Sequence, residues 1–557
     1  MKTINKAALT VLLLSLSWAG FAQDADQAYN FSENLYIGSA RSLAMGNAFT
    51  AVGGDLGALS INPAGSGVLR MSEFEISPSL ITAVGKTDYL SSYNQADFTK
   101  FSLPSFAYSQ NISTGRVSGL VSFNFGFAFN RVKSFNSISS ATGVMKAGRG
   151  NNSSSWLGDK VMTLLDYDPA DYGNYNSAIP WSAQLAWDTW LVEEIDDLML
   201  GATENYDYEI DRPYLGGDMY QDVYRKTVGG IDEFSVNFAG NVNDNFYFGV
   251  NINIYDVDYR VTDIYTEKAF NSLDFESGIQ YYTYNYWQKT VGTGIGVKAG
   301  VIFLPTEHLR LGATISTPTK YILTDYWGAS MANSFDNGNK NDVSTPNGTY
   351  DYKISAPMRY SLGVAYTLGT FGLVSFDYEG VNYSKILMKD YNGGTAVFRD
   401  ENAYINRNYK RNANIFRAGA ELNIVPRLAL RGGYAYYDDG RPNYLGNQFV
   451  SAGIGFRLGK GANLDFAWQG QLKNENGFTL YNDYDGFKDP VGFVNHANIK
   501  IVASLRFKFL QLLIIKKGCP WTAFFYVYII LRTRKHTASL RTSSEGRQGR
   551  RGTDRLV

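Results

Sequence analysis

The stretch Gly119-Leu-Val-Ser-Phe-Asn-Phe-Gly-Phe-Ala-Phe-Asn-Arg131 alternates large apolar residues with small or neutral polar ones. In a strand, alternate side chains point to opposite faces, so one face would be apolar and the other weakly polar. A soluble sandwich would bury its large residues and expose charged ones. Here the second face is uncharged, which suits a plugged or water-filled lumen, and the apolar face suits lipid. This stretch predicts one strand of a transmembrane barrel.

The same two-residue period recurs from Glu73 to Phe509, in pairs of runs joined by short turns such as Val242-Asn-Asp-Asn245. We therefore predict an all-β fold, a transmembrane antiparallel β-barrel of about fourteen strands. Their expected starts are Glu73, Lys100, Arg116, Ile231, Asn245, Gly292, His308, Lys353, Phe371, Ala413, Arg427, Gln448, Ala462 and Ala497. Long connections alternate with the short ones and cover residues 132–230, 261–291, 322–352, 387–412 and 474–496. Short periplasmic turns and long outer loops would produce this alternation.

The composition of the 557 residues excludes several classes of protein. Charged residues make up 18%, below the roughly 25% of soluble domains, and the net charge of −1 does not suggest a nucleic-acid partner. A single cysteine, Cys519, rules out a disulfide framework, and three histidines lie far apart. The sequence contains neither a GxSxG nor a GxxxxGK[ST] motif. We expect no enzyme, no catalytic residue, no cofactor and no metal site.

The chain divides into four expected parts. Residues 1–22 are predicted to be a signal peptide, with a basic start, a short apolar core and a small-residue cleavage site. Residues 23–72 form an N-terminal hatch, and residues 73–509 form the barrel with its long extracellular loop 132–230. The basic tail 510–557 differs from the rest, and we expect read-through or a frame error there. A genuine extension, helical or disordered, is the alternative.

The expected hatch lacks the two-residue period from Phe31 to Met71 and is rich in small residues. It contains Arg41-x-x-Ala44-Met45-Gly46-Asn47-Ala48-Phe49, then Asp55, then Asn62-Pro63-Ala64-Gly65. These motifs resemble the N-terminal hatch of the FadL/TodX family of outer-membrane transporters for hydrophobic compounds.

That resemblance implies a fourteen-stranded barrel with its lumen plugged by Phe31–Met71, and a ligand that is a long-chain fatty acid or an aromatic hydrocarbon. It also implies a movable hatch and lateral exit through the wall, where Pro78 would disturb an early strand. The expected hatch and gating residues are Gly46, Asn47, Phe49, Asn62, Pro63, Ala64 and Gly65. Pro63 lacks an N–H donor and holds its neighbour extended, which suits a segment that moves, although simple turn formation is the alternative.

Two apolar stripes in loop 132–230 are candidates for an external binding site. Ser182 could cap a helix carrying Trp187, Trp190, Leu191, Ile195 and Leu198 at helical spacing. Ser155 could begin a second helix with Trp156, Val161, Leu164 and Leu165. The helices would either enclose an apolar groove or pack the loop onto the barrel rim. We take Trp156, Trp187, Trp190 and Leu191 as candidate ligand contacts.

A fatty-acid carboxylate would need a buried cation inside the barrel. Strand phase places four basic residues on the lumen face, Lys298, Arg310, Arg417 and Arg431. Glu379 and Glu421 share this face, so the alternative is a ladder of ion pairs that stabilises the barrel.

The sequence thus predicts a passive transporter of hydrophobic small molecules in the outer membrane of a Gram-negative cell. Its expected partners are the hydrophobic ligand, outer-membrane lipid and lipopolysaccharide, and the barrel assembly machinery, with no nucleic acid and a monomeric state. One alternative is an acceptor or scaffold for exported proteins in a secretion system, as in Bacteroidetes-type relatives, and another is a hemin receptor. A general porin is disfavoured, because a plug would block free diffusion.

Overall fold

The computed structural model describes residues 24–147, 154–192, 217–275, 277–459, 461–472, 474–483 and 488–509. The expected signal peptide, residues 1–22, and the tail, residues 510–557, lie outside these residues. Among the helices of the described ranges, none is both long enough and apolar enough to cross a membrane.

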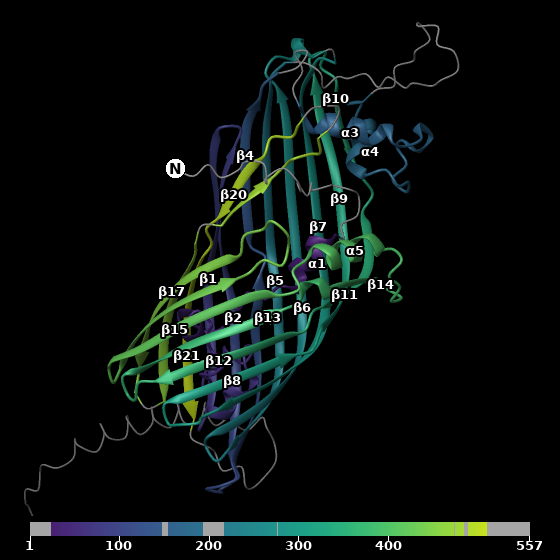
Figure 1. The fold of residues 1–557 in the computed structure, drawn as a ribbon. Coiled ribbons are helices and arrows are strands. Elements are labelled where there is room, and N and C mark those ends of the chain that lie inside the picture. The colour runs from purple at the N-terminus through teal and green to yellow at the C-terminus, as the bar shows by residue number, and fades with distance from the viewer. Residues whose placement is uncertain are drawn as a thin grey trace, which may run out of the picture. The chain divides into compact units, whose positions relative to one another are not determined.

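Fourteen strands within the described residues close an antiparallel barrel, as predicted (Figure 1). In order around the barrel they are β1 (Ser72–Tyr89), β2 (Ser92–Ser113), β3 (Leu120–Ser134), β5 (Met219–Val242), β6 (Phe246–Ala269), β7 (Ile279–Phe303), β8 (Leu309–Ser316), β12 (Arg359–Thr367), β13 (Gly372–Val381), β15 (Ala413–Val425), β16 (Leu428–Tyr437), β17 (Asn447–Arg457), β18 (Ala462–Gln471) and β21 (Ile499–Phe509). The last strand, β21, pairs with β1, for example Phe507 opposite Phe74, and this pairing closes the sheet.

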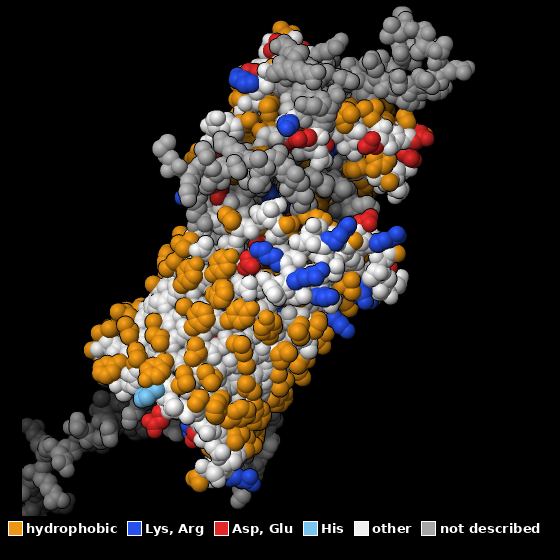
Figure 2. Space-filling model, in the orientation of Figure 1, with side chains coloured by type: hydrophobic (Ala, Val, Ile, Leu, Met, Phe, Trp, Pro, Cys, Tyr) orange, Lys and Arg blue, Asp and Glu red, His pale blue; other side chains and the backbone are white. Residues whose placement is uncertain are grey.

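The predicted alternation of faces is confirmed on β3. Phe123, Phe125 and Phe127 are 41–44% exposed on the outside, whereas Asn124 between them is 1% exposed. Similar apolar side chains cover the lower part of the visible barrel surface (Figure 2). This belt is the surface that a lipid bilayer would cover.

Several strands continue well beyond the apolar belt. β6 has 24 residues, whereas about 9–11 suffice to cross a bilayer. Its outward side chains are apolar from Phe246 to Ile254 and then change to Asp256 and Arg260. The extension also contains β4 (Ser137–Met145), β9 (Thr319–Phe335), β10 (Lys340–Ser344), β11 (Gly348–Ala356), β14 (Leu387–Asp390), β19 (Glu475–Phe478) and β20 (Gly492–His496).

The predicted long loops 261–291 and 322–352 are therefore wrong. β6 runs to Ala269 and β7 starts at Ile279, so only a short connection joins them, and most of 322–352 belongs to β9, β10 and β11. Above the belt the outward face of β6 becomes polar while its inward face stays buried and is mostly apolar, so the lipid pattern ends while strand pairing continues.

The barrel wall is irregular where β1 carries Pro78. The β1–β2 register shifts between Ser77 and Ser79, at the level where β2 carries Pro104. Proline donates no backbone hydrogen bond, so two prolines at one level weaken the pairing between β1 and β2 there. This is the disturbance of an early strand that was expected from Pro78.

Residues 24–71 fill the lumen, as the resemblance implies. They form α1 (Ala25–Ser32), α2 (Ala40–Ala44) and the 3₁₀ helix η2 (Pro63–Val68). η2 packs against β3, β5, β6 and β7, while α2 packs against β16, β17, β18 and β21. Contacts with opposite walls mean that the hatch plugs the barrel.

Short helices lie outside the sheet. They are α3 (Trp156–Leu165), η4 (Pro169–Asp171), α4 (Trp181–Asp188), η5 (Ser272–Asp274), η6 (Tyr383–Lys385) and α5 (Arg399–Asn408). In Figure 1, α3 and α4 lie beside the upper part of the barrel, and α5 lies near the hatch helix α1.

Candidate functional site

The Asn62-Pro63-Ala64-Gly65 segment is fixed to the hatch and to the wall. The Asn62 side chain accepts a hydrogen bond from the Ala64 N–H at 2.9 Å and so caps η2, while Pro63 occupies the first turn. The side-chain amide of Asn62 also donates hydrogen bonds to the carbonyl oxygens of Thr50 at 2.6 Å and Val301 at 3.2 Å. Asn62 therefore joins three separate parts of the chain.

Two glycines in the wall allow this close approach. A Cβ atom at Gly300 would collide with the Asn62 side chain, and one at Gly249 would collide with the Pro63 carbonyl. Sequence reasoning did not single out these glycines. The one feature of the sequence that could have indicated them is a glycine at a lumen-facing position of a strand, which allows another backbone to come close.

The Gly46-Asn47-Phe49 element makes a sharp turn inside the hatch. Gly46 and Asn47 both have positive φ, 61° and 60°, a conformation that favours glycine and asparagine. The Asn47 amide donates to the Tyr36 carbonyl at 2.8 Å, and the buried Phe49 ring lies 5.4 Å from the Arg41 guanidinium. These predicted hatch residues are thus placed in one compact turn.

Asparagines on four adjacent strands hold one side of the hatch, and we call them the asparagine ladder. Each donates its side-chain amide to a hatch carbonyl between positions 59 and 69. The pairs are Asn111 to Leu69 (2.9 Å), Asn124 to Ser66, Asn237 to Pro63 (3.0 Å) and Asn251 to Leu59 (2.9 Å). The strand pattern placed Asn124 on the lumen face, but it did not predict what this residue binds.

Two of the predicted lumen cations also hold the hatch backbone. Lys298 donates to the Ser60 carbonyl, and Arg310 donates to the Val52 carbonyl at 2.7 Å. Both lie on the lumen side, as the strand phase predicts. Each therefore directs at least one donor to a hatch carbonyl.

The other two predicted cations take part in ion pairs. Arg417 pairs with Glu379 at 3.0 Å, and Arg431 pairs with Glu421 at 2.6 Å and with Asp465 at 2.7 Å. This arrangement is the ladder of ion pairs considered as the alternative. The sequence did not predict that the hatch takes part in this ladder. Arg41 of the hatch also pairs with Glu421, at 2.9 Å.

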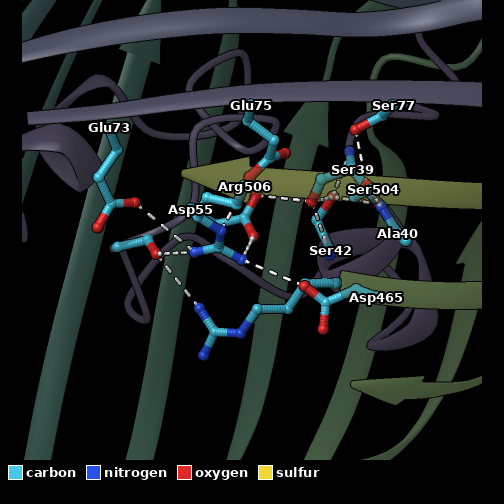
Figure 3. A network of polar contacts seen from close by, with 12 residues as sticks. Ser39, Ala40, Ser42, Asp55, Glu73, Glu75, Ser77, Asp465, Ser504 and Arg506 are labelled. Carbon is cyan, nitrogen blue, oxygen red and sulfur yellow. Dashed lines mark hydrogen bonds and ion pairs between the residues drawn. The ribbon is translucent and has the colours of Figure 1, made fainter. Parts of the chain in front are cut away.

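Arg506 on β21 is the centre of a second ionic cluster, which sequence reasoning missed (Figure 3). Its guanidinium lies 3.1 Å from Glu75 and 3.3 Å from Asp55 of the hatch. Asp465 at 3.6 Å and Glu73 at 3.9 Å complete the group. We call the residues Arg41, Asp55, Glu73, Glu75, Glu421, Arg431, Asp465 and Arg506 the ionic cluster. Strand phase could have placed Arg506 in the lumen, since it lies between the outward-facing Leu505 and Phe507.

The two predicted loop helices exist, but the second differs from the prediction at both ends. Ser155 caps α3 by accepting from the Gly158 N–H at 3.1 Å, as expected. Ser182 does not cap α4, because this helix starts at Trp181, directly after Pro180. The helix ends at Asp188, since Trp190 adopts a positive φ of 59°. The expected continuation to Ile195 and Leu198 lies outside the described residues.

Most apolar side chains of α3 and α4 pack inward. Leu157, Leu164 and Leu185 are buried in one cluster with the barrel residues Tyr282 and Met331. This is the packing alternative for the loop. Of the candidate ligand contacts, Leu191 is buried in that cluster, Trp187 packs against Tyr172, Trp190 is 63% exposed, and Trp156 lines a cavity.

That cavity, of about 880 Å³, lies on the outer side of the hatch, and α1 forms part of its wall. We call it the upper cavity. Its apolar lining comes from both hatch and barrel and includes Leu35, Ile81, Phe135, Trp156, Val223, Tyr259, Tyr265, Phe449, Phe478, Leu480 and Val494. Such a volume and lining suit a small-molecule ligand.

Most cations that line the upper cavity have a carboxylate partner. Lys133 pairs with Glu33 of the hatch, Arg225 with Asp263 on the neighbouring strand at 3.4 Å, and Arg441 with Asp439 of the same loop at 2.9 Å. Lys500 differs. It is 7% exposed, donates to the neutral Gln469 side chain at 2.9 Å, and lies 4.8 Å from the centre of the Phe449 ring. In the described part of the chain, no carboxylate lies within ion-pair distance of it.

In the described ranges, no group of three or more His, Cys, Asp or Glu residues is placed to hold a metal ion. The site consists of a hatch, a ring of hatch contacts and a cavity above them.

Comparisons with known protein families and with curated proteins found no match. Solved structures do match, including a FadL homologue of Pseudomonas aeruginosa, with 13% identity, coverage of 86% of this chain and 100% of that chain, and a TM-score of 0.49. The fold is similar to that of FadL-type proteins. The toluene transporters TodX of Pseudomonas putida (14% identity, 85% and 99% coverage, TM-score 0.47) and TbuX of Ralstonia pickettii (14%, 86% and 99%, 0.43) also match. At this identity the similarity concerns the fold, and the function has to be inferred from this chain's own residues.

Proposed function

We propose that this protein is an outer-membrane channel of the FadL/TodX type that takes up amphiphilic hydrophobic molecules carrying a carboxylate, the class to which long-chain fatty acids belong. The ligand enters from outside, binds in the upper cavity, and continues inward when the hatch moves. The observation that carries this proposal is Lys500, a buried ammonium that has no carboxylate partner among the described residues and lies in a cavity with an aromatic lining.

The cost of burying a charge explains why Lys500 points to an anionic ligand. A buried ammonium group is unfavourable unless an anion or strong hydrogen-bond acceptors compensate it. Gln469 supplies one neutral acceptor, and the Phe449 ring supplies a weak cation–π contact. A ligand carboxylate would form a charge-assisted hydrogen bond in place of this weak compensation.

The rest of the upper cavity suits an apolar tail. Trp156 belongs to the same lining, and its ring lies 5.7 Å from that of Tyr265 and 5.1 Å from that of Tyr284. An alkyl chain placed against these rings leaves water, and each buried methylene contributes about 0.8 kcal/mol. The expected orientation has the carboxylate at Lys500 and the tail toward Trp156.

A titration with matched ligands tests this proposal. Tryptophan fluorescence of the purified protein is followed while oleate, methyl oleate, toluene and hemin are added in parallel. We expect saturable binding of oleate. Lys500→Met should weaken oleate binding roughly ten- to hundredfold, the value of a hydrogen bond between charged groups, and leave methyl oleate binding unchanged.

The control variant is Lys289→Met, which removes an exposed ammonium from the outer face of β7. It should leave oleate binding unchanged. Equal oleate affinities in the native protein and in Lys500→Met would refute the role of Lys500. If none of the four ligands binds, the uptake function itself is wrong and an acceptor for exported proteins becomes the better proposal.

A further inference from the structure

A second cavity, of about 360 Å³, lies between the hatch and the strands β15–β18 and β21. It is lined at one end by Arg457 and Gly459, at the short turn between β17 and β18. Short turns mark the periplasmic end of such barrels, so this cavity opens toward the periplasm. We call it the lower cavity, and the uptake proposal does not use it.

The lining of the lower cavity is unlike that of the upper one. Among the described residues that line it, five are cationic and two are carboxylates. The cations are Arg41, Arg431, Arg457, Arg506 and Lys508, and the carboxylates are Glu421 and Asp465. A surface of this kind repels an apolar ligand but attracts an anion.

The excess of cations arises because other carboxylates of the ionic cluster do not reach the lining. Asp55, Glu73 and Glu75 are each at most 2% exposed and contact Arg506, as Figure 3 shows. With Glu421 and Asp465 they make five carboxylates, which match the five cations of the lining in number. Arg41, Arg431, Arg506 and Lys508 each pair with at least one of these carboxylates, whereas Arg457 forms no ion pair among the described residues.

Exposure decreases from the mouth of the lower cavity to its depth. Arg457 is exposed, and the side chain of Lys508 is 35% exposed. Arg41, Arg431 and Arg506 have side-chain exposures of 14%, 7% and 4%. An anion entering from the periplasm would meet the exposed cations first and the buried guanidinium groups next.

We propose that the lower cavity binds a small soluble oxyanion, a phosphate or a carboxylate, from the periplasmic side. Guanidinium groups bind the oxygen atoms of both anions in the same planar geometry. Arg41 and Gly54 belong to the hatch, so the bound anion contacts hatch and wall together. Its occupancy is therefore coupled to the position of the hatch on this side.

Calorimetric titration of the full-length protein in detergent with inorganic phosphate tests the site. Sulfate and acetate are titrated in parallel, all at one ionic strength set with chloride. We expect saturable phosphate binding. Asn463→Asp places a negative charge in the lining without changing the size of the side chain, and we expect it to weaken phosphate binding about tenfold. Asn463→Ser, which is neutral, should bind phosphate as the native protein does.

Two further comparisons distinguish binding inside the cavity from attraction to charges on the surface. Arg457→Gln should weaken phosphate binding about threefold, whereas Arg427→Gln, an exposed arginine at the neighbouring turn outside the lining, should not. A short-chain phosphatidylglycerol with the same phosphate chemistry should bind more weakly than free phosphate, because the cavity lies inside the wall. Phosphate heats no different from those of chloride, or equal phosphate affinity in Asn463→Asp, would overturn the proposal, as would tighter binding of the lipid.

Discussion

Two parts of the hatch are held mainly by different kinds of bond, although one ion pair also joins Glu33 of the hatch to Lys133 on β3. On the side of β2, β3, β5 and β6, the asparagine ladder donates neutral hydrogen bonds to backbone carbonyls around Pro63. On the side of β15–β18 and β21, Arg41 and Asp55 of the hatch form ion pairs with Glu421 and Arg506 of the wall. Neutral bonds can be exchanged for water one at a time. Separating buried charges costs more, since each is left unpaired in a poorly solvated lumen.

This difference indicates which side moves. We expect the ladder side, which carries Asn62 and Pro63, to detach during transport while the ionic side stays anchored. The positions of the motif residues fit this expectation, because Asn62 contacts the wall through one 3.2 Å hydrogen bond to Val301 and no ion pair. Each prediction below tests one side against the other.

The largest effect is expected on the ionic side. Arg506→Met would leave Asp55, Glu75 and Asp465 buried without their shared cation. We expect the free energy of unfolding to fall by about 3–5 kcal/mol, measured by urea denaturation of the protein in detergent. A loss below about 1 kcal/mol would mean that the ionic cluster is not an anchor.

A smaller effect is expected on the ladder side. Asn237→Ala removes the donor to the Pro63 carbonyl and the donor to Asn251. We expect a loss of about 1–3 kcal/mol in the same assay, because these acceptors stay buried without a partner. Asn412→Ala, at an exposed position, is the matched control and should have no effect. A larger loss for Asn237→Ala than for Arg506→Met would reverse the comparison.

The sequence predicted the membrane part of the fold because lipid imposes a simple rule on it. Strand starts at Glu73, Asn245, Ala413 and Ala462 fall within one residue of those in the structure. Above the belt this rule no longer applies, so the sequence pattern predicted loops for the outer halves of β6 and β7. The lumen positions of Lys298 and Arg417 followed from strand phase, but their partners are hatch and wall groups far away in sequence. Lys500 and Arg506 share that phase and were overlooked, since their roles depend on which carboxylates come near.

The smallest expected effect concerns a loop beside the upper cavity. Asp489 accepts hydrogen bonds from the backbone N–H groups of Leu480 and Tyr481, and burial raises its pKa to about 8. A carboxyl group with a raised folded-state pKa is most favourable below its unfolded pKa of about 4, and this stability is lost as the pH rises through 8. We expect the protection of both amides from hydrogen exchange to fall roughly tenfold or more between pH 6 and 9, after correction for intrinsic exchange.

Asp489→Asn should remove this pH dependence. The Met388 amide is an internal reference, since it donates to the neutral Asn402 side chain at 2.8 Å. If protection at Leu480 and Tyr481 follows that of Met388 across the pH range, ionisation of Asp489 does not control the loop.

Locking the ladder side tests hatch movement most directly. The side-chain oxygens of Ser66 and Asn237 lie 2.5 Å apart, so Ser66→Cys with Asn237→Cys places two thiols within reach of a disulfide, in a Cys519→Ser background. Uptake of oleate into proteoliposomes is measured with the pair oxidised and then reduced, alongside oleate binding. We predict that oxidation abolishes uptake without changing binding, and that reduction restores uptake. Equal uptake in the oxidised and reduced states would contradict movement of this side of the hatch.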